Sequence, residues 1–354
     1  MCGILGLTFL DDSHKVKENN NLIKLLMACF EIGMRETAIR GYDAAGVAYI
    51  TGHENSFKTN IFKSKKNAWK ATISEEWIET IQSMRKNSDA KDVHMHWIGH
   101  CRKMTEGKTD NNENNHPLEI DNRLIMVHNG SVKDFKEIIK KDTSNFIKNT
   151  MPGEVDSGVF GTLALKYLKD NKTDLQNGIK EAFENKDLYI PLEGAVVILD
   201  KLDANKIFMI RTYDRPLYVS SISQINAIIY ASQSEFIYNF IYNVCGLANV
   251  FNADPGLMNY SLPQELLTDK IFKIDRNEHM SKKVFSFIDT KIRKSFWNEY
   301  VYSSTSLYDG EKVYNGSEYY WEKNKNKVIN ATIVVPEENI FMQMAEDENE
   351  VGIH

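Results

Sequence analysis

The chain has 354 residues, of which 42% are hydrophobic and 26% are charged. This composition is typical of a globular protein and argues against a disordered chain. The formal net charge of −6 gives no electrostatic reason to expect a nucleic-acid partner. No stretch approaches the roughly 18 apolar residues needed to span a bilayer, so no membrane partner is expected.

The four cysteines lie far apart and form no CxxC pair. This spacing argues against a zinc ribbon and against a dense disulfide framework. The apolar N-terminal stretch has no positively charged segment before it, which argues against a secretory signal. We therefore predict a cytoplasmic protein.

The first third of the chain alternates between strand and helix patterns. A buried strand is predicted over 2–10, and apolar residues at helical spacing predict an amphipathic helix over 19–36. A polar turn leads into a strand over 40–50, and a second helix follows over 75–87. A strand over 91–102 then enters a polar loop.

An apolar strand over 123–130, ending in a turn, comes before a block of helices and a second group of strands. Because strands frame the helices without strict alternation, the order predicts an α+β arrangement. The helices are expected over 132–146, 157–171, 174–186 and 234–244, and the strands over 194–200, 206–212, 216–222 and 225–233.

After about residue 254 the sequence becomes rich in aromatic residues and short polar turns. We place a boundary near Asp254–Pro255, which gives a main domain over 2–254 and a small C-terminal extension over 255–354. The extension either docks a partner protein or forms a small β-rich core. The aromatic residues that would dock a partner are Trp297, Tyr300, Tyr319, Tyr320 and Trp321.

Cys2 follows the initiator methionine directly. If Met1 is removed, one residue carries both a thiol and a free α-amine. Only the thiolate is a nucleophile. An α-amine that titrates near ~8 can accept the thiol proton. The alternative is that Cys2 is simply the first residue of a buried strand.

The stretch VHNG ends the strand over 123–130. An acyl transfer through Cys2 needs hydrogen-bond donors aimed at the developing oxyanion. The side-chain amide of Asn129 and the backbone N–H of Gly130 offer such a pair. Taken alone, however, Asn-Gly after an apolar strand favours a hairpin turn.

Charged residues near two other predicted element ends suit an α-amino acid. Arg102 ends a strand and can hold a carboxylate by two hydrogen bonds, with the hydroxyl of Thr105 nearby. Asp156 at a helix start can pair with an ammonium group. The alternatives are a solvated surface arginine and an aspartate that caps its helix.

The stretch HMHWIGH resembles a metal-ligand pattern, because His94 and His96 are predicted on one side of a strand and His100 follows four residues later. No nearby carboxylate is placed convincingly as a further ligand. Ordinary packing and hydrogen bonding are therefore preferred, and we expect neither a metal nor another cofactor.

Six motifs occur in an order that resembles the class II glutamine amidotransferase domain, a member of the N-terminal-nucleophile hydrolases. The likeness covers about residues 2–250, and RGYDAAG is closest to the glucosamine-6-phosphate synthase version. The motifs are MCGI at the start, RGYDAAG at 40–46, GHCRKMTEG at 99–107, NHP at 115–117, VHNG at 127–130 and EVDS at 154–157.

The resemblance implies a four-layer α/β/β/α sandwich that hydrolyses glutamine to glutamate and ammonia. It makes Cys2 the nucleophile, its α-amine the base, and Asn129 and Gly130 the oxyanion hole. The remaining roles are the α-carboxylate partner Arg102, the α-ammonium partner Asp156, the pocket-lining Thr105 and His128, and the supporting pair Arg40 and Asp43.

The sequence also departs from the family pattern. Lys103 and Met104 replace the usual Trp-Ala or Trp-Ser, and Glu106, Ala44 and Gly158 stand where histidine, serine and an acidic residue are common. We find no signature of a known synthase in the remaining chain, so ammonia is expected to pass to a separate synthase. The alternatives are hydrolysis of another amide and a catalytically silent binding module.

Overall fold

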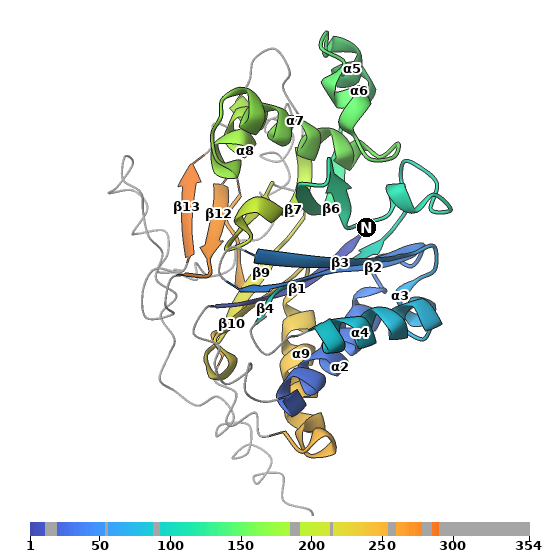
Figure 1. Cartoon of the computed structure of the whole chain (residues 1–354), viewed down its shortest axis with the longest axis vertical. Helices are drawn as coiled ribbons and strands as arrows, with labels where there is room; N and C mark the ends of the chain where they lie inside the picture. Colours follow the sequence, from blue (N-terminus) through green and yellow to red (C-terminus); the bar gives the residue numbers. More distant parts are fainter. Residues whose placement is uncertain are drawn as a thin grey trace, which may run out of the picture.

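Two antiparallel sheets packed face to face form the centre of the protein (Figure 1). The computed structural model describes residues 1–10, 20–53, 56–87, 93–184, 192–212, 215–253, 260–268, 270–277 and 285–289. Helices cover the outer face of each sheet, so the layers run helix, sheet, sheet, helix. The α+β class and the four-layer sandwich are confirmed.

Within the described residues, the first sheet has seven strands in the order β11-β9-β10-β1-β4-β2-β3, with β1 at its centre. Both neighbours of β1 are antiparallel to it. The strands are β1 (Gly3–Phe9), β2 (Ala44–His53), β3 (Ser56–Ser64), β4 (Val93–Arg102), β9 (Tyr218–Ile222), β10 (Ala227–Ala231) and β11 (Gln264–Glu265).

In the part of the chain that the structure describes, the second sheet has six strands in the order β13-β12-β8-β7-β6-β5, again with antiparallel neighbours. Its strands are β5 (Leu118–Ile120), β6 (Leu124–Val132), β7 (Leu192–Asp200), β8 (Lys206–Arg211), β12 (Lys270–Asp275) and β13 (Phe285–Asp289).

The helices divide between the two outer layers. Apolar residues at helical spacing on α2 pack with α9 onto the first sheet, and α7 and α8 cover the second. The helices are α2 (Asn20–Thr37), α3 (Ala68–Ala71), α4 (Glu75–Asn87), α5 (Phe135–Lys141), α6 (Phe146–Thr150), α7 (Asp156–Asp170), α8 (Leu175–Glu184) and α9 (Ser234–Leu247). The described residues also form the 3₁₀ helices η1 (Asn112–Asn114), η2 (Lys201–Asp203), η3 (Ser223–Ile225) and η4 (Ala248–Phe251).

A third core lies between the sheets and positions the N-terminus. Alternate residues of facing strands meet there, including Ile4 of β1, Ile98 of β4 and Val127 of β6. Full burial of each such side chain contributes about 1.5–3 kcal/mol to folding. This packing places the start of β1 beside β6, where Figure 1 marks the N-terminus.

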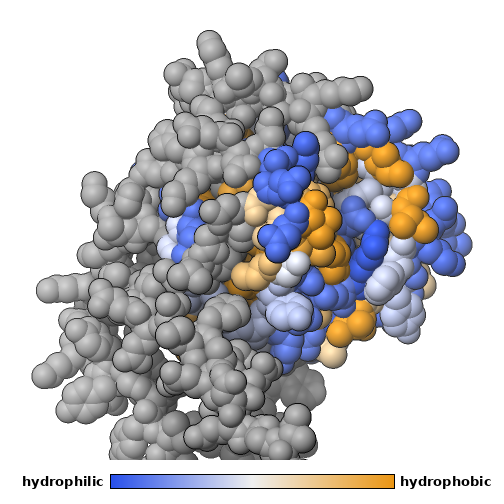
Figure 2. Space-filling model, turned by 90° about the horizontal axis from the view of Figure 1, so that it is seen from below, coloured by the Kyte–Doolittle hydropathy of each residue, from blue (hydrophilic) through white to orange (hydrophobic). Residues whose placement is uncertain are grey.

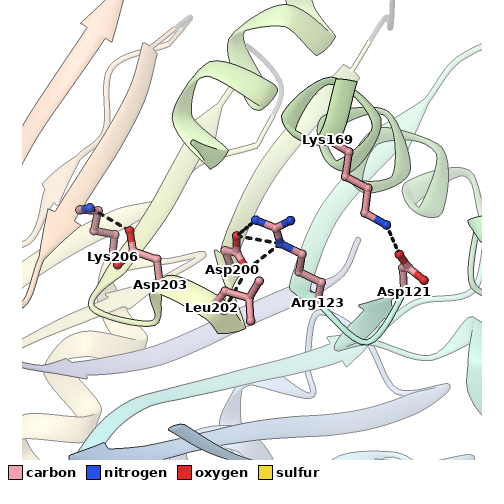
Figure 3. A network of polar contacts seen from close by, with 7 residues as sticks. All are labelled: Asp121, Arg123, Lys169, Asp200, Leu202, Asp203 and Lys206. Atoms are coloured by element: carbon pink, nitrogen blue, oxygen red, sulfur yellow. Dashed lines mark hydrogen bonds and ion pairs between the residues drawn. The ribbon is translucent and has the colours of Figure 1, made fainter. Parts of the chain in front are cut away.

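Polar contacts hold the end of β6 that is remote from the N-terminus (Figure 3). The β5–β6 hairpin turns through Asp121 and Asn122, which both have positive φ. Beyond the turn, Arg123 donates two hydrogen bonds to one oxygen of Asp200, at 3.0 and 2.7 Å. This contact ties the start of β6 to the end of β7.

Residues beyond 254 also join the sandwich. Strand β12 pairs with β8, and Ile271 and Ile274 are fully buried. The buried Arg276 donates through Nε to the carbonyl of Phe9, the last residue of β1. The division into 2–254 and 255–354 stays a prediction, and the aromatic docking residues lie outside the described residues.

The outer face of the first helical layer exposes several aromatic and aliphatic side chains. Tyr238 and Tyr242 of α9 are both exposed, as is Val250 of η4. Figure 2, seen from below, shows hydrophobic residues on this side of the molecule separated by hydrophilic ones. No helix within the described ranges has the length and apolar character of a membrane span.

Most expected elements are present, and the structure differs from the sequence prediction in three respects. Strand β6 continues through Asn129 and Gly130 to Val132, so the expected hairpin turn there is wrong. The single helix expected over 132–146 is the pair α5 and α6, because Asp142 accepts hydrogen bonds from the backbone N–H groups of Ser144 and Ile147 and turns the chain. Strands β3, β5, β11, β12 and β13 and the short helix α3 were not predicted.

Candidate active site

Cys2 lies directly before β1, partly buried between the two sheets. Its backbone N–H donates a 3.0 Å hydrogen bond to Oδ1 of Asn129 on β6. Met1 is present in this structure, so the nitrogen of Cys2 is a peptide nitrogen. Removal of Met1 would leave an amine at the same place.

The sulfur of Cys2 lies against the backbone of Lys103. The Lys103 N–H donates to Sγ at 3.3 Å, and the Lys103 carbonyl lies 3.5 Å from Sγ. Burial raises the pKa of the Cys2 thiol, while the Lys103 N–H and the positive charge of Arg102 lower it. The negative charge of Asp156 adds to the increase.

Asn129 and Gly130 lie on neighbouring positions of β6. Asn129 points toward the first sheet, as Val127 does, and its Nδ2 is buried with no hydrogen-bond partner in the described part of the chain. A Cβ atom on Gly130 would lie 1.8 Å from the carbonyl oxygen of Glu193. Glycine is therefore required by close packing against β7.

Arg102 is the last residue of β4, and it is buried. Nη1 donates to Oδ1 of Asn115 at 2.9 Å, and Nη2 donates to the carbonyls of Glu106 and Gly107. The surface-arginine alternative is therefore wrong. Each of these acceptors is a neutral oxygen, so they do not cancel the positive charge.

Asp156 is the first residue of α7 rather than its cap, because Val155 holds the capping position. The expectation that Asp156 caps the helix is wrong. Oδ2 of Asp156 instead accepts a 2.6 Å hydrogen bond from the N–H of Val132, at the end of β6. The carboxylate is buried, and its charge is close enough to act on Cys2.

Arg40 and Asp43 come from the segment between α2 and β2. Nε of Arg40 donates to the Cys2 carbonyl at 3.0 Å. Oδ2 of Asp43 accepts from the N–H of Met104 at 2.7 Å and lies 3.5 Å from Nζ of Lys103. Both residues thus fix backbone next to the sulfur.

Thr105 and His128 lie in different surroundings. Thr105 is exposed in the loop after β4. His128 is buried on the α7 side of the second sheet, where Nδ1 lies 2.8 Å from Oγ of Ser157. Burial lowers the pKa of His128. The pocket-lining roles of these two residues stay predictions.

The three histidines of HMHWIGH do not share one face. A register shift opposite Ile50 and Thr51 leaves His94 against Phe9 and Trp97 in the helix-side core. His96 lies between the sheets, with its ring nitrogens 3.0 Å from Oγ1 of Thr8 and 2.7 Å from the Ala204 carbonyl. The expectation that His94 and His96 share a side is wrong. The described part of the chain has no group of three or more metal-ligating side chains.

Sequence reasoning missed three residues that contact the site. Asn115 holds Arg102, Lys103 contacts the sulfur, and Tyr42 contacts Lys103. Each lies inside a motif already noted, so membership in those motifs was the available signal. Their contacts join positions up to 101 residues apart, which spacing alone does not reveal.

Sequence comparison finds that part of the chain is similar to known enzymes. A glutamine–fructose-6-phosphate aminotransferase from Staphylococcus aureus is 31% identical over 140 residues, which cover 39% of this chain. An enzyme of the same name from Sulfurisphaera tokodaii is 24% identical over 220 residues, or 62% of this chain. The resemblance of this chain to the class II glutamine amidotransferases is confirmed.

The match to these amidotransferases is partial. It spans 18% of the Staphylococcus enzyme and 31% of the Sulfurisphaera enzyme. No family model matches the chain. A solved structure of a glutamine phosphoribosylpyrophosphate amidotransferase from B. subtilis overlaps 81% of this chain and 49% of its own, at 14% identity and a TM-score of 0.48.

Proposed function

We propose that this chain hydrolyses glutamine to glutamate and ammonia, with Cys2 as the nucleophile. The observation that carries the proposal is the orientation of Asn129. Its oxygen accepts the Cys2 N–H, and its buried Nδ2 has no partner within the described residues. A buried donor without an acceptor costs about 1–3 kcal/mol, so such groups need an explanation. An oxyanion formed beside Sγ would supply the missing acceptor.

The reaction follows from the groups around the sulfur. After loss of Met1, the α-amine of Cys2 takes the thiol proton, and Sγ bonds to the carboxamide carbon of glutamine. The carbonyl electrons move onto oxygen, where Asn129 Nδ2 and the Gly130 N–H stabilise the charge. The ammonium of Cys2 then returns a proton to the leaving nitrogen, and ammonia departs. Water hydrolyses the thioester to release glutamate.

Two buried charges support an α-amino acid as the substrate. Arg102 donates to neutral acceptors, and the Asp156 carboxylate is close enough to interact with both Cys2 and Arg102. Glutamine would place its α-carboxylate on Arg102 and its α-ammonium on Asp156. Its carboxamide would then extend toward Sγ.

Ammonia release from glutamine by the purified protein tests the proposal. Wild type and a Cys245→Ala control, altered at an exposed cysteine on α9, should release ammonia at equal rates. Cys2→Ala should reduce release to background. Full activity in Cys2→Ala, or release only from amides other than glutamine, would overturn the proposal.

A catalytically silent regulatory or binding module is a second candidate, because the chain's own carbonyls at Glu106 and Gly107 occupy Arg102. Calorimetric binding of glutamine without ammonia release would favour it. In the active case, ammonia is proposed to pass to a separate synthase in the cytoplasm.

A further inference from the structure

Lys103 makes polar contacts both through its backbone N–H and through its side-chain ammonium group. Its backbone N–H donates to Sγ of Cys2 at 3.3 Å. At the other end, Nζ lies 4.3 Å from the centroid of the Tyr42 ring, 3.2 Å from the Tyr42 hydroxyl and 3.5 Å from Oδ2 of Asp43. We call Lys103, Tyr42 and Asp43 the lysine clamp.

The clamp acts where regular pairing stops. Ala44 and Arg102 form the last pair between β2 and β4, so ladder hydrogen bonds no longer fix Lys103 and Met104. Asp43 instead holds the backbone on both sides of Lys103. Its N–H donates to the Arg102 carbonyl at 3.0 Å, and its carboxylate accepts the Met104 N–H at 2.7 Å.

We infer that Lys103 is a positioning residue for the nucleophile. Its ammonium, held by the face of Tyr42 and the carboxylate of Asp43, keeps the Lys103 N–H on the sulfur of Cys2. This inference rests on the proposed function, in which Cys2 attacks the carboxamide. A hydrogen bond from this N–H favours the thiolate over the thiol, so the clamp would increase the fraction of reactive sulfur.

The expected effect is modest because the clamp faces solvent. The Tyr42 side chain is exposed and Lys103 is partly exposed. Exposed cation–π contacts and ion pairs are weak, so loss of the ammonium should change reactivity on the order of 10-fold. If Lys103 had a role only at the protein surface, its replacement would leave the reactivity of the Cys2 sulfur unchanged.

Alkylation of Cys2 by iodoacetamide as a function of pH tests the clamp directly. The experiment uses a Cys245→Ser background, because Cys245 is exposed while Cys29 and Cys101 are buried. Peptide mass spectrometry follows Cys2 alone. In Lys103→Met, alkylation at pH 7 should be on the order of 10-fold slower, with the midpoint about one pH unit higher.

The controls separate positioning from general damage. Lys103→Arg keeps the cation and should restore the profile, whereas Lys108→Met, an exposed lysine in the same loop, should leave it unchanged. Tyr42→Leu removes the ring from the opposite side and should shift the profile in the same direction. A wild-type profile in both Lys103→Met and Tyr42→Leu would overturn the inference.

This test is separable from glutamine turnover. Alkylation needs only the sulfur, so a shifted profile in a protein that releases no ammonia would reject the proposed function and keep the clamp. Normal glutamine turnover together with an unshifted alkylation profile in the variants would keep the proposed function and reject the clamp. Asp43→Asn combined with Lys103→Met should slow alkylation little more than either change alone, because the groups act as one unit.

Discussion

Oδ1 of Asn129 accepts the backbone N–H of Cys2 at 3.0 Å, which joins the start of β1 to β6 across the two sheets. The Asn129 amide thus holds Cys2 through its oxygen, and its nitrogen remains available for another acceptor. Replacement of Asn129 tests whether this nitrogen donates to the oxyanion.

Asn129→Ala should lower kcat for glutamine on the order of 10²–10³-fold, because one donor to the oxyanion is lost. KM should change little, since the oxyanion exists only in the transition state. Steady-state kinetics measure both constants. Asn149→Ala, at an exposed asparagine on α6, serves as the control. A rise in KM with unchanged kcat would contradict the oxyanion role.

Asp156→Asn should reduce the preference for glutamine over its analogue without an α-amino group. A charged hydrogen bond is worth about 1.5–3 kcal/mol, so kcat/KM for glutamine should fall about 10- to 150-fold. The analogue should lose far less. The asparagine oxygen can still accept the Val132 N–H, which preserves the local backbone contact.

Asp142→Asn is the matched control for Asp156. Asp142 is also buried and also accepts a backbone N–H, from Ile147, but it lies at the α5–α6 bend. Its loss should lower the melting temperature without changing the ratio of the two substrates. Equal losses for glutamine and its analogue in Asp156→Asn would refute the ammonium contact.

How far the sequence predicts this fold depends on whether a signal is local. The helix over 20–37 and the strand over 93–102 follow from apolar spacing. Strand β3 was missed because its sequence, SFKTNIFKS, shows no clear alternation of apolar and polar residues, and it is identified only by its pairing with β2. Asn129-Gly130 was expected to turn because the dipeptide favours hairpins, but pairing with β7 keeps it extended.

For the candidate site, the sequence indicates which residues belong to it but not which residues they contact. Cys2, Asn129 and Arg102 were all singled out from motifs. Contacts such as that of Lys103 with Tyr42 join positions 61 residues apart, and only the folded sheets bring them together. The separation of His94 from His96 likewise depends on a register shift that strand periodicity does not reveal.

Stability should fall as pH decreases below 6.5, partly because of His94. Burial lowers the pKa of His94 from 6.5 to about 4, so the folded state holds it neutral while the unfolded chain takes up a proton near 6.5. The stabilisation is complete above pH 6.5 and is lost between 6.5 and 4. At pH 5 the loss is about 2 kcal/mol for this residue alone.

Urea unfolding at pH 7 and pH 5 measures this effect. His94→Gln keeps an acceptor for Nε1 of Trp97 but does not titrate, so its loss between the two pH values should be about 2 kcal/mol smaller than that of wild type. Identical pH dependence in the two proteins would show that His94 does not contribute.

Arg276→Met should destabilise the protein by about 1.5–3 kcal/mol, because the buried Phe9 carbonyl and Oδ1 of Asn205 both lose a charged donor. Urea unfolding measures the loss. Lys273→Met, at a partly exposed lysine on β12, should change stability far less. Equal stability of Arg276→Met and wild type would show that Arg276 does not hold the end of β12 to the sandwich.

The central claim is that the sulfur and the primary amine of one residue split the carboxamide. Intact-protein mass spectrometry of active enzyme, before and after treatment with a diazoketone analogue of glutamine, tests it most directly. We predict a chain that lacks Met1 and gains one adduct, located on Cys2, as ammonia release is lost in equal proportion. Fully active protein that retains Met1, or inactivation with the adduct elsewhere, would contradict the account.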